Sequence, residues 1–227
     1  MKRELKGKYL LAAVITSMIF LLGMFLGVVI EGQRSNFLSD VVEQQKLSFS
    51  SLQLQYQLIS EFGQQKNCLA VSSAFDGYMK QLITAQERLN KYEKDSTLNK
   101  DAFLMLKQEY TQAEINYWFL AKKTKEVCGR DITTILFFYS PEERCPDCNG
   151  QSFVLTYIKQ LLKDKVLIFS FDSTLESEPL IKMLESTYNI TRYPAMVINE
   201  KTYQGMYDKD ALLKEICPDL KEKPEGC

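Results

Sequence analysis

The sequence predicts an α/β domain in its C-terminal third, preceded by an all-helical region and an N-terminal transmembrane helix. Three observations support this. After Gly129, apolar runs typical of buried strands alternate with helical patterns; residues 35–128 contain no proline and repeat apolar residues every three or four positions; and residues 9–30 carry no charge. The expected parts are a tail 1–8, a transmembrane helix 9–30, a helical region 31–128, an α/β domain 130–220 and a C-terminal tail 221–227.

Composition excludes several classes of function. The 227 residues leave room for one or two domains. Lys and Arg number 28 and Asp and Glu 29, so no nucleic-acid partner is expected. The chain has no histidine, which excludes imidazole bases and His-ligated zinc, and we expect no metal and no cofactor. The chain has six cysteines, an even number, and all of them follow the predicted transmembrane segment. This pattern favours an oxidising compartment.

The N-terminal apolar run predicts a single-pass membrane protein. At a rise of about 1.5 Å per residue, a helix over residues 9–30 is roughly 33 Å long, enough to cross the hydrocarbon core of a lipid bilayer. Basic residues outnumber the single acid in the tail before the run, so the N-terminus should be cytoplasmic and the C-terminal domain extracytoplasmic, at the cell membrane. The alternative is a cleaved signal peptide, but its apolar core is shorter and Val28-Val29-Ile30 is a poor cleavage site.

Three apolar stripes predict helices in the middle of the chain. The first stripe, within residues 36–62, fits either a coiled-coil stalk joining two copies or a third helix packed in the same chain. Its few charges favour packing within the chain, while a homodimer through the helical region stays an alternative. The stripes are Leu38, Val42, Gln45, Phe49, Leu52, Tyr56 and Ile59; Cys68, Val71, Phe75, Tyr78, Leu82, Ala85, Leu89 and Tyr92; and Phe103, Leu106, Tyr110, Ala113, Tyr117, Leu120, Thr124 and Val127.

The second and third stripes predict an antiparallel helical hairpin. The polar stretch 93–99 joins them, and Asn99 is the expected N-cap of the later helix. Cys68 and Cys128 each lie 30 residues from Leu98, so equal arms bring both thiols to one level. A disulfide needs Cα atoms within about 7 Å, which a close hairpin provides. We therefore predict a Cys68–Cys128 disulfide; two buried thiols are the alternative.

The pattern after Gly129 predicts the element order β-α-β-α-β-β-α. At the junction of the first strand and first helix stands Cys145-Pro146-Asp147-Cys148. Arg192-Tyr193-Pro194 precedes the third strand, and Tyr203-Gln204-Gly205 lies in the fourth. The expected strands are 132–139, 166–171, 195–199 and 202–206, and the expected helices are about 145–162, 178–188 and 209–216.

These three motifs, in this order, resemble the thioredoxin superfamily in its minimal, glutaredoxin-like form over about residues 130–220. The resemblance implies a three-layer α/β/α fold. It also implies that the protein is a thiol–disulfide oxidoreductase whose partners are protein thiols and disulfides. Pro194 corresponds to the family's cis-proline. A cis Tyr193–Pro194 peptide would face the sulfurs and expose backbone to an extended substrate.

The expected chemistry assigns a role to each residue of the motif. Cys145, exposed at a helix N-terminus, would be the nucleophile, and Cys148, one turn later and more buried, would resolve the mixed disulfide. Pro146 is tolerated early in a helix. Arg144 would lower the pKa of Cys145, and Asp147 would raise it.

One position departs from the family's pattern. Many members place a buried carboxylate six residues before the first cysteine, as a proton acceptor for the second. This sequence has Tyr139 there. The sequence therefore assigns no side chain to proton transfer from Cys148.

Other interpretations of the cysteines stay open at this point. A C-x-x-C can be half of a zinc site, but this chain offers no second pair of ligands. The motif can also be a structural disulfide in a non-enzymatic scaffold or binding protein. Cys217 and Cys227 form a possible second structural disulfide, which spacing alone does not decide.

Overall fold

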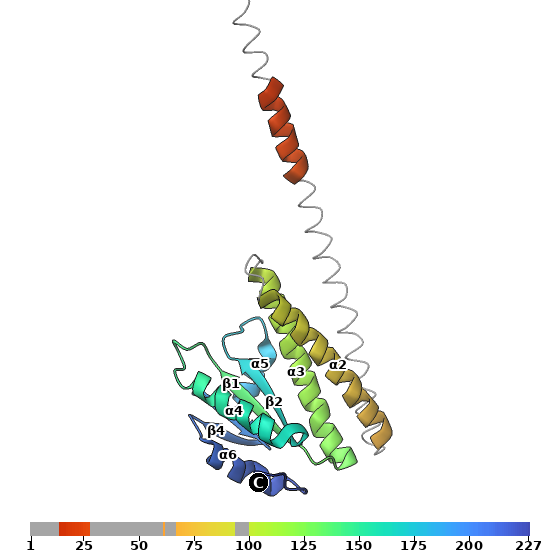
Figure 1. Cartoon of the computed structure of the whole chain (residues 1–227), viewed down its shortest axis with the longest axis vertical. Helices are drawn as coiled ribbons and strands as arrows, with labels where there is room; N and C mark the ends of the chain where they lie inside the picture. Colours follow the sequence, from red (N-terminus) through yellow and green to blue (C-terminus); the bar gives the residue numbers. More distant parts are fainter. Residues whose placement is uncertain (1–13, 28–60, 62–66, 94–99) are drawn as a thin grey trace, which may run out of the picture. The chain divides into compact units, whose positions relative to one another are not determined.

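A computed structural model describes residues 14–27, 61, 67–93 and 100–227 (Figure 1). The chain divides into two units, Met1–Gln57 and Leu58–Cys227, which we describe separately. The expected cytoplasmic tail 1–8, the first apolar stripe and the loop with Asn99 lie outside the described residues.

In the first unit, residues 14–27 form a helix with exposed side chains. The prediction of a transmembrane helix over residues 9–30 is wrong. Among the helices that the structure describes, none combines the length and apolar character needed to cross a membrane. This finding corrects the N-terminal part of the predicted fold class.

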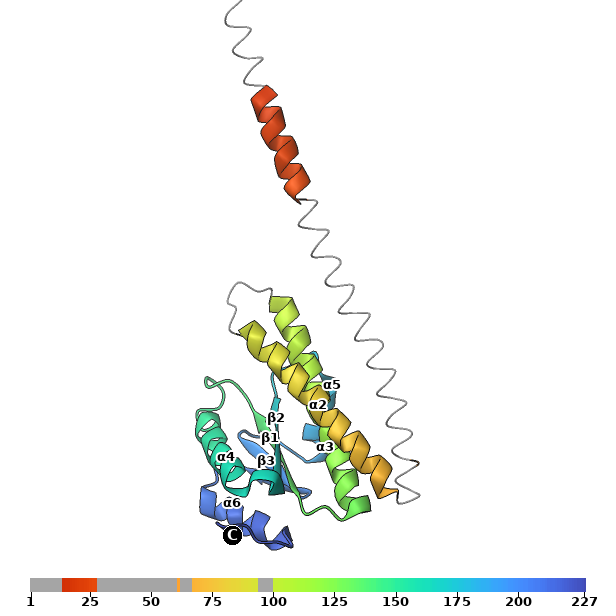
Figure 2. The same cartoon turned by 45° about the vertical axis from the view of Figure 1, so that its right-hand side comes forward.

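The second unit begins with the predicted helical hairpin. Helices α2 (Cys68–Glu93) and α3 (Lys100–Cys128) lie side by side (Figure 2). The side chain of Asn67 caps α2 by accepting a hydrogen bond from the Ala70 N–H at 3.2 Å. The inward-facing residues of α2 are those of the predicted stripe, with Val71, Phe75, Tyr78 and Ala85 buried. A disulfide joins Cys68 to Cys128 with a Cα–Cα distance of 5.0 Å, in agreement with the equal arms of the hairpin.

A four-stranded mixed sheet follows, in the order β2-β1-β3-β4. Strands β1 and β2 are parallel, whereas β3 runs antiparallel to both β1 and β4. The central strand β1 is buried over almost its whole length, because it consists mostly of apolar and β-branched residues. The strands are β1 Thr133–Tyr139, β2 Val166–Asp172, β3 Ala195–Ile198 and β4 Lys201–Gln204.

Helices cover both faces of the sheet (Figures 1 and 2). One face packs against α4 (Cys148–Leu162) and α6 (Lys209–Ile216) around a buried apolar core. The other face packs against α5 (Pro179–Thr187) and α3, where the Tyr117 ring lies edge-on to Phe169 at 5.9 Å. The hairpin is therefore part of the same folded unit as the sheet. The core residues on the α4 face include Ile135, Phe137, Leu155, Ile158, Leu162, Met196, Ile198, Leu212 and Ile216.

The element order matches the predicted β-α-β-α-β-β-α, with two boundaries displaced by more than one residue. The first helix begins at Cys148 rather than near Cys145. The Cys148 N–H donates to the Cys145 carbonyl at 3.1 Å in a turn, and the helical bond that starts α4 runs from the Gln151 N–H to the carbonyl of the N-cap residue Asp147 at 2.9 Å. The fourth strand ends at Gln204, because Gly205 adopts a φ of 101°, a left-handed conformation that turns the chain.

Candidate functional site

Strand β1 leads directly into the two cysteines. After Tyr139, residues 140–147 form a turn in which the Arg144 and Cys145 N–H groups both donate to the Pro141 carbonyl, at 2.9 and 3.0 Å. A disulfide joins Cys145 to Cys148 with a Cα–Cα distance of 5.4 Å. Cys148, not Cys145, is the first residue of α4. The helix N-terminus therefore lies at the second cysteine.

The expected exposure of Cys145 is wrong. Cys145 is 1% exposed and Cys148 4% exposed. The flanking residues Arg144, Pro146 and Asp147 are exposed. Asp147 is the N-cap residue of α4, but its side chain makes no capping hydrogen bond. In the disulfide-bonded form, both cysteines are therefore buried from an incoming thiolate.

The Tyr193–Pro194 peptide is cis, the isomer that the resemblance implied. Pro194 is buried, and its carbonyl accepts a hydrogen bond from the Gly205 N–H at 2.7 Å. The next residue, Ala195, pairs with Phe138 near the end of β1. Since β3 is antiparallel to β1, the cis peptide and the Cys145–Cys148 disulfide lie at the same end of the sheet.

Gln204 holds the loop before the cis peptide. Its Oε1 atom accepts hydrogen bonds from the N–H groups of Thr191 and Arg192, at 2.9 and 3.0 Å. The Arg192 guanidinium in turn donates to the Gln204 carbonyl at 2.9 Å. The sequence contained this residue within the motif Tyr203-Gln204-Gly205, but nothing in the pattern indicated its role.

A buried carboxylate, Glu114, also lies near β2 and was missed by the sequence reasoning. It is 3% exposed, and its Oε1 atom accepts hydrogen bonds from the Ser170 N–H at 3.2 Å and the Tyr110 hydroxyl at 3.1 Å. Its Oε2 atom has no partner among the described residues. Burial raises the pKa of Glu114 to about 8, although the hydrogen bonds from Ser170 and Tyr110 oppose the rise.

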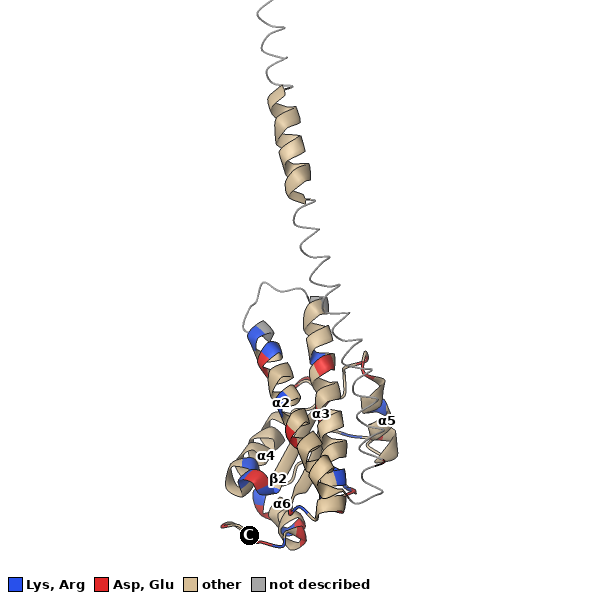
Figure 3. Cartoon of the chain, turned by 90° about the vertical axis from the view of Figure 1, so that its right-hand side faces the viewer, with Lys and Arg blue, Asp and Glu red and all other residues tan. Residues whose placement is uncertain are grey.

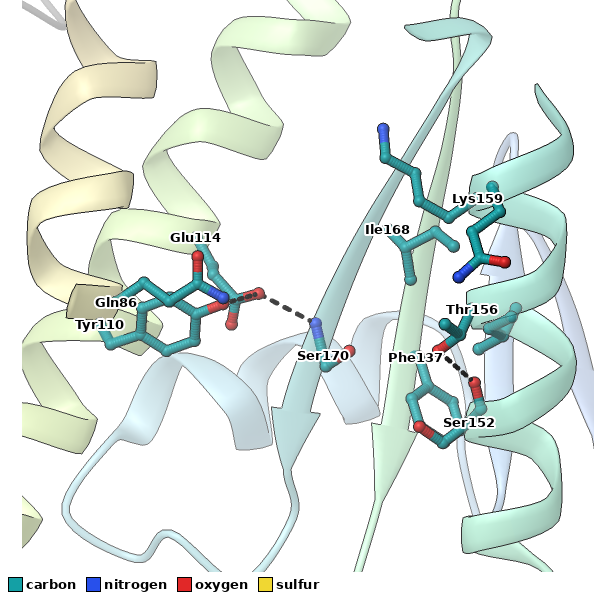
Figure 4. Close-up of a pocket in the computed structure, with 11 residues that line it drawn as sticks. Gln86, Tyr110, Glu114, Phe137, Ser152, Thr156, Lys159, Ile168 and Ser170 are labelled. Carbon is teal, nitrogen blue, oxygen red and sulfur yellow. Dashed lines mark hydrogen bonds between the residues drawn. The ribbon is translucent and has the colours of Figure 1, made fainter. Parts of the chain in front are cut away.

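Glu114 borders a cavity of about 290 Å³ at the edge strand β2, lined from one face of the sheet by α2 and α3 and from the other by α4 (Figure 4). Ser152 and Thr156 line it from α4, one and two turns after Cys148. Lys159 lies at the same wall, with Nζ donating to the carbonyls of Lys163 and Val166 at 2.8 Å each.

Helix α3 also holds the loop between β2 and α5. The Gln112 side chain donates a 2.7 Å hydrogen bond to the carboxylate of Glu178, a residue that is 1% exposed. Lys107 forms an ion pair with Asp172. Burial alone would raise the pKa of Asp172, but the hydrogen bonds from Lys107 and Thr174 have the larger effect. The pKa of Asp172 therefore lies below its ordinary value. Acidic and basic positions both occur on α3 and on α5 (Figure 3), in keeping with these contacts.

The remaining cysteines are paired as well. Cys217 and Cys227 form a disulfide with a Cα–Cα distance of 5.5 Å, which answers the pairing left open by their spacing. All six cysteines are therefore in disulfides. In this form, neither sulfur of the C-x-x-C motif is available as a thiolate ligand for zinc.

No model of a known protein family matches the sequence, and a search of curated proteins finds no match either. The functional interpretation therefore depends on the chemistry of the residues themselves.

Proposed function

We propose that this protein is a thiol–disulfide oxidoreductase that exchanges disulfides with protein substrates through Cys145 and Cys148. The observation that carries the proposal is the Cys145–Cys148 disulfide at the end of β1, at the same end of the sheet as the cis Tyr193–Pro194 peptide. The resemblance to the thioredoxin superfamily over about residues 130–220 supports the same chemistry.

The exchange transfers two electrons. In the reducing direction, the Cys145 thiolate attacks one sulfur of a substrate disulfide, and the other substrate sulfur leaves as a thiolate. The Cys148 thiolate then attacks the Cys145 sulfur, forming the Cys145–Cys148 bond and releasing the second substrate thiolate. In the oxidising direction, the same bonds form and break in reverse, and the substrate dithiol becomes the disulfide. The assignment of Cys145 as the nucleophile rests on the resemblance.

The compartment of the proposed function is oxidising and extracytoplasmic. Two further disulfides, Cys68–Cys128 and Cys217–Cys227, lie outside the C-x-x-C motif. Disulfides of this kind persist in secreted and periplasmic proteins and are rare where cellular thiols keep cysteines reduced.

Two substitutions test the proposal in the purified chain. Cys145→Ala should abolish insulin reduction, because it removes the attacking sulfur. Cys148→Ala should leave mixed disulfides with substrates, visible as adducts that dithiothreitol releases. The control is the double variant Cys217→Ala and Cys227→Ala, which removes a disulfide outside the motif and should keep its activity under native conditions. Undiminished insulin reduction by Cys145→Ala would remove the proposed mechanism.

The burial of both sulfurs favours a second candidate function, a binding or scaffold protein in which the disulfide is structural. The reduction potential of the Cys145–Cys148 pair separates the two. A structural disulfide has a potential below about −300 mV and resists glutathione, whereas an exchanging disulfide has a higher one. Equilibration with glutathione mixtures, followed by thiol alkylation and mass spectrometry, measures this potential for all three pairs.

A further inference from the structure

A chain of polar contacts connects the cis peptide to helix α5. The Tyr193 hydroxyl donates a 2.6 Å hydrogen bond to Oε1 of Glu185, which lies on α5. The other oxygen of this carboxylate, Oε2, accepts from the Lys182 ammonium at 2.8 Å. Both oxygens of Glu185 are therefore used, and the side chain of the residue before Pro194 is fixed to the helix.

The chain of contacts continues to the end of β1. The Lys182 ammonium also donates to the Ser173 carbonyl at 3.0 Å. The N–H and hydroxyl of Ser173 both donate to the Tyr139 carbonyl, each at 2.9 Å. Tyr139 is the last residue of β1, the strand that leads to Cys145. An unbroken series of contacts thus joins the cis peptide to the strand that carries the cysteines.

The contact between Tyr193 and Glu185 is a strong one. The Glu185 side chain is 9% exposed, so its carboxylate depends on protein donors rather than on water. Burial, followed by the hydrogen bond to Glu185, raises the pKa of Tyr193 to about 12. The phenol therefore stays protonated at neutral pH and acts as the donor. Hydrogen bonds to a charged acceptor are about twice as strong as neutral ones.

The backbone of Tyr193 is not paired with a neighbouring strand that the structure describes. Within the described part of the chain, its N–H and C=O take part in no backbone hydrogen bond, whereas the next carbonyl, that of Pro194, accepts from Gly205. Unpaired backbone groups at the end of a sheet can pair with an extended peptide. The position of these groups is set by the Tyr193 side chain and its anchor on α5.

We propose that Glu185 is a positioning residue for substrate binding: through Tyr193 it holds the cis Tyr193–Pro194 peptide in register with the end of β1, so that an extended cysteine-containing peptide can pair beside the disulfide. This inference rests on the proposed function. Loss of the anchor weakens peptide binding and leaves the reactivity of the two sulfurs unchanged, since Glu185 reaches the disulfide only through other residues.

The test uses single-turnover kinetics of the full oxidised chain with a dithiol peptide in excess. The peptide's two thiols become a disulfide as the Cys145–Cys148 pair is reduced, so no further oxidant is needed. Tyr193→Phe and Glu185→Ala should each raise the half-saturating peptide concentration about tenfold, with the maximal rate within about twofold. Glu185→Gln keeps an oxygen acceptor for Tyr193 and should restore the value to within about threefold. The rate with dithiothreitol, which needs no peptide pairing, should be unchanged in all three.

Tyr188→Phe is the matched control. The Tyr188 hydroxyl also donates to a glutamate, Glu200, at 2.9 Å, but Glu200 lies in the turn after β3, at the end away from the cis peptide. This variant should leave the half-saturating concentration unchanged. Tyr193→Phe removes a single oxygen atom and carries the test even where Glu185→Ala does not fold.

The outcomes separate this inference from the proposed function. If the wild-type chain exchanges disulfides and Tyr193→Phe has the wild-type half-saturating concentration, the positioning role is wrong and the oxidoreductase proposal stands. An equal slowing of the peptide and dithiothreitol reactions also contradicts the inference, because it indicates a general structural loss. A wild-type chain that does not react with the peptide overturns both.

Discussion

Glu114 should make the stability of this protein depend on pH between 5 and 8. The carboxyl group is almost fully buried in α3, and its Oε2 atom has no partner among the described residues. Burial raises its pKa from the ordinary 4.5 to about 8. In that interval the folded protein retains a proton that the unfolded chain has released.

The sign and the size follow from this difference. Below pH 4.5 the carboxyl group is protonated in both states, so its burial carries no cost of charge. As the pH rises from 4.5 to 8, the unfolded chain ionises and the folded protein does not, so the free energy of unfolding falls. At about 1.36 kcal/mol per pH unit, an interval of about 3.5 pH units corresponds to roughly 5 kcal/mol. The loss is complete once the pH exceeds the pKa of the folded state.

Few other groups titrate in this interval. The chain has no histidine, and all six cysteines are in disulfides. Hydrogen bonds from Lys165 and from backbone N–H groups outweigh burial at Asp131 and lower its pKa to about 2, and the pKa of Asp172 is lowered as well. A lowered carboxyl pKa contributes stability that is present above the ordinary value of 3.8 and is lost as the pH falls through the folded-state pKa. This loss occurs at pH values below the interval from 5 to 8.

Urea unfolding at pH 5, 6, 7 and 8, with the disulfides kept oxidised, measures the effect. The wild-type free energy of unfolding should fall by several kcal/mol over this series, whereas Glu114→Gln, which cannot ionise, should change by less than about 1 kcal/mol. Glu109→Gln is the control, because Glu109 lies on the same helix but is partly exposed and paired with Arg88. Parallel curves for the wild type and Glu114→Gln would refute the reasoning.

Two further predictions concern stability. Replacing both cysteines of Cys68–Cys128, which are 60 residues apart, should cost about 4 kcal/mol, and replacing both of Cys217–Cys227, 10 residues apart, about 3 kcal/mol. Urea unfolding of the two double variants checks this order, and a larger loss for the shorter loop contradicts it. Gln112→Leu should cost about 1–3 kcal/mol, because the buried carboxylate at the start of α5 loses its donor from α3. A thermal midpoint equal to that of the wild type counts against this contact.

The sequence predicted two kinds of element well: a helix that buries one face only, and a strand that is buried on both faces. Strand β1 has an unbroken run of apolar and β-branched residues, and its expected range differs from the observed Thr133–Tyr139 by one residue. The stripe of α2 indicated its buried face, because that helix packs on one side only and leaves residues such as Leu69 exposed. The equal lengths of the two helical arms were enough to predict that Cys68 and Cys128 lie opposite each other in the hairpin.

The exposure of the cysteines could not be predicted in the same way. Whether Cys145 begins the helix depends on which carbonyl accepts the first helical hydrogen bond, and both a helix and a turn are compatible with Cys-Pro-Asp-Cys. In the structure that acceptor is the carbonyl of Asp147, so Cys145 lies in the preceding turn, where it is 1% exposed. The prediction for the N-terminal run was wrong as well, because none of the helices among the described residues is long and apolar enough to cross a membrane.

The polar residues of α3 show why the periodicity of apolar residues did not predict the contacts that support the candidate site. A helix that packs on one side has one apolar stripe, but α3 contacts α2 on one side and the sheet on the other. Its second buried face carries polar groups that look like solvent-exposed positions in the sequence. Lys107 binds Asp172 and Gln112 binds Glu178, at the two ends of the loop that contains Ser173. Because Ser173 holds the end of β1, the hairpin supports the strand that carries the cysteines.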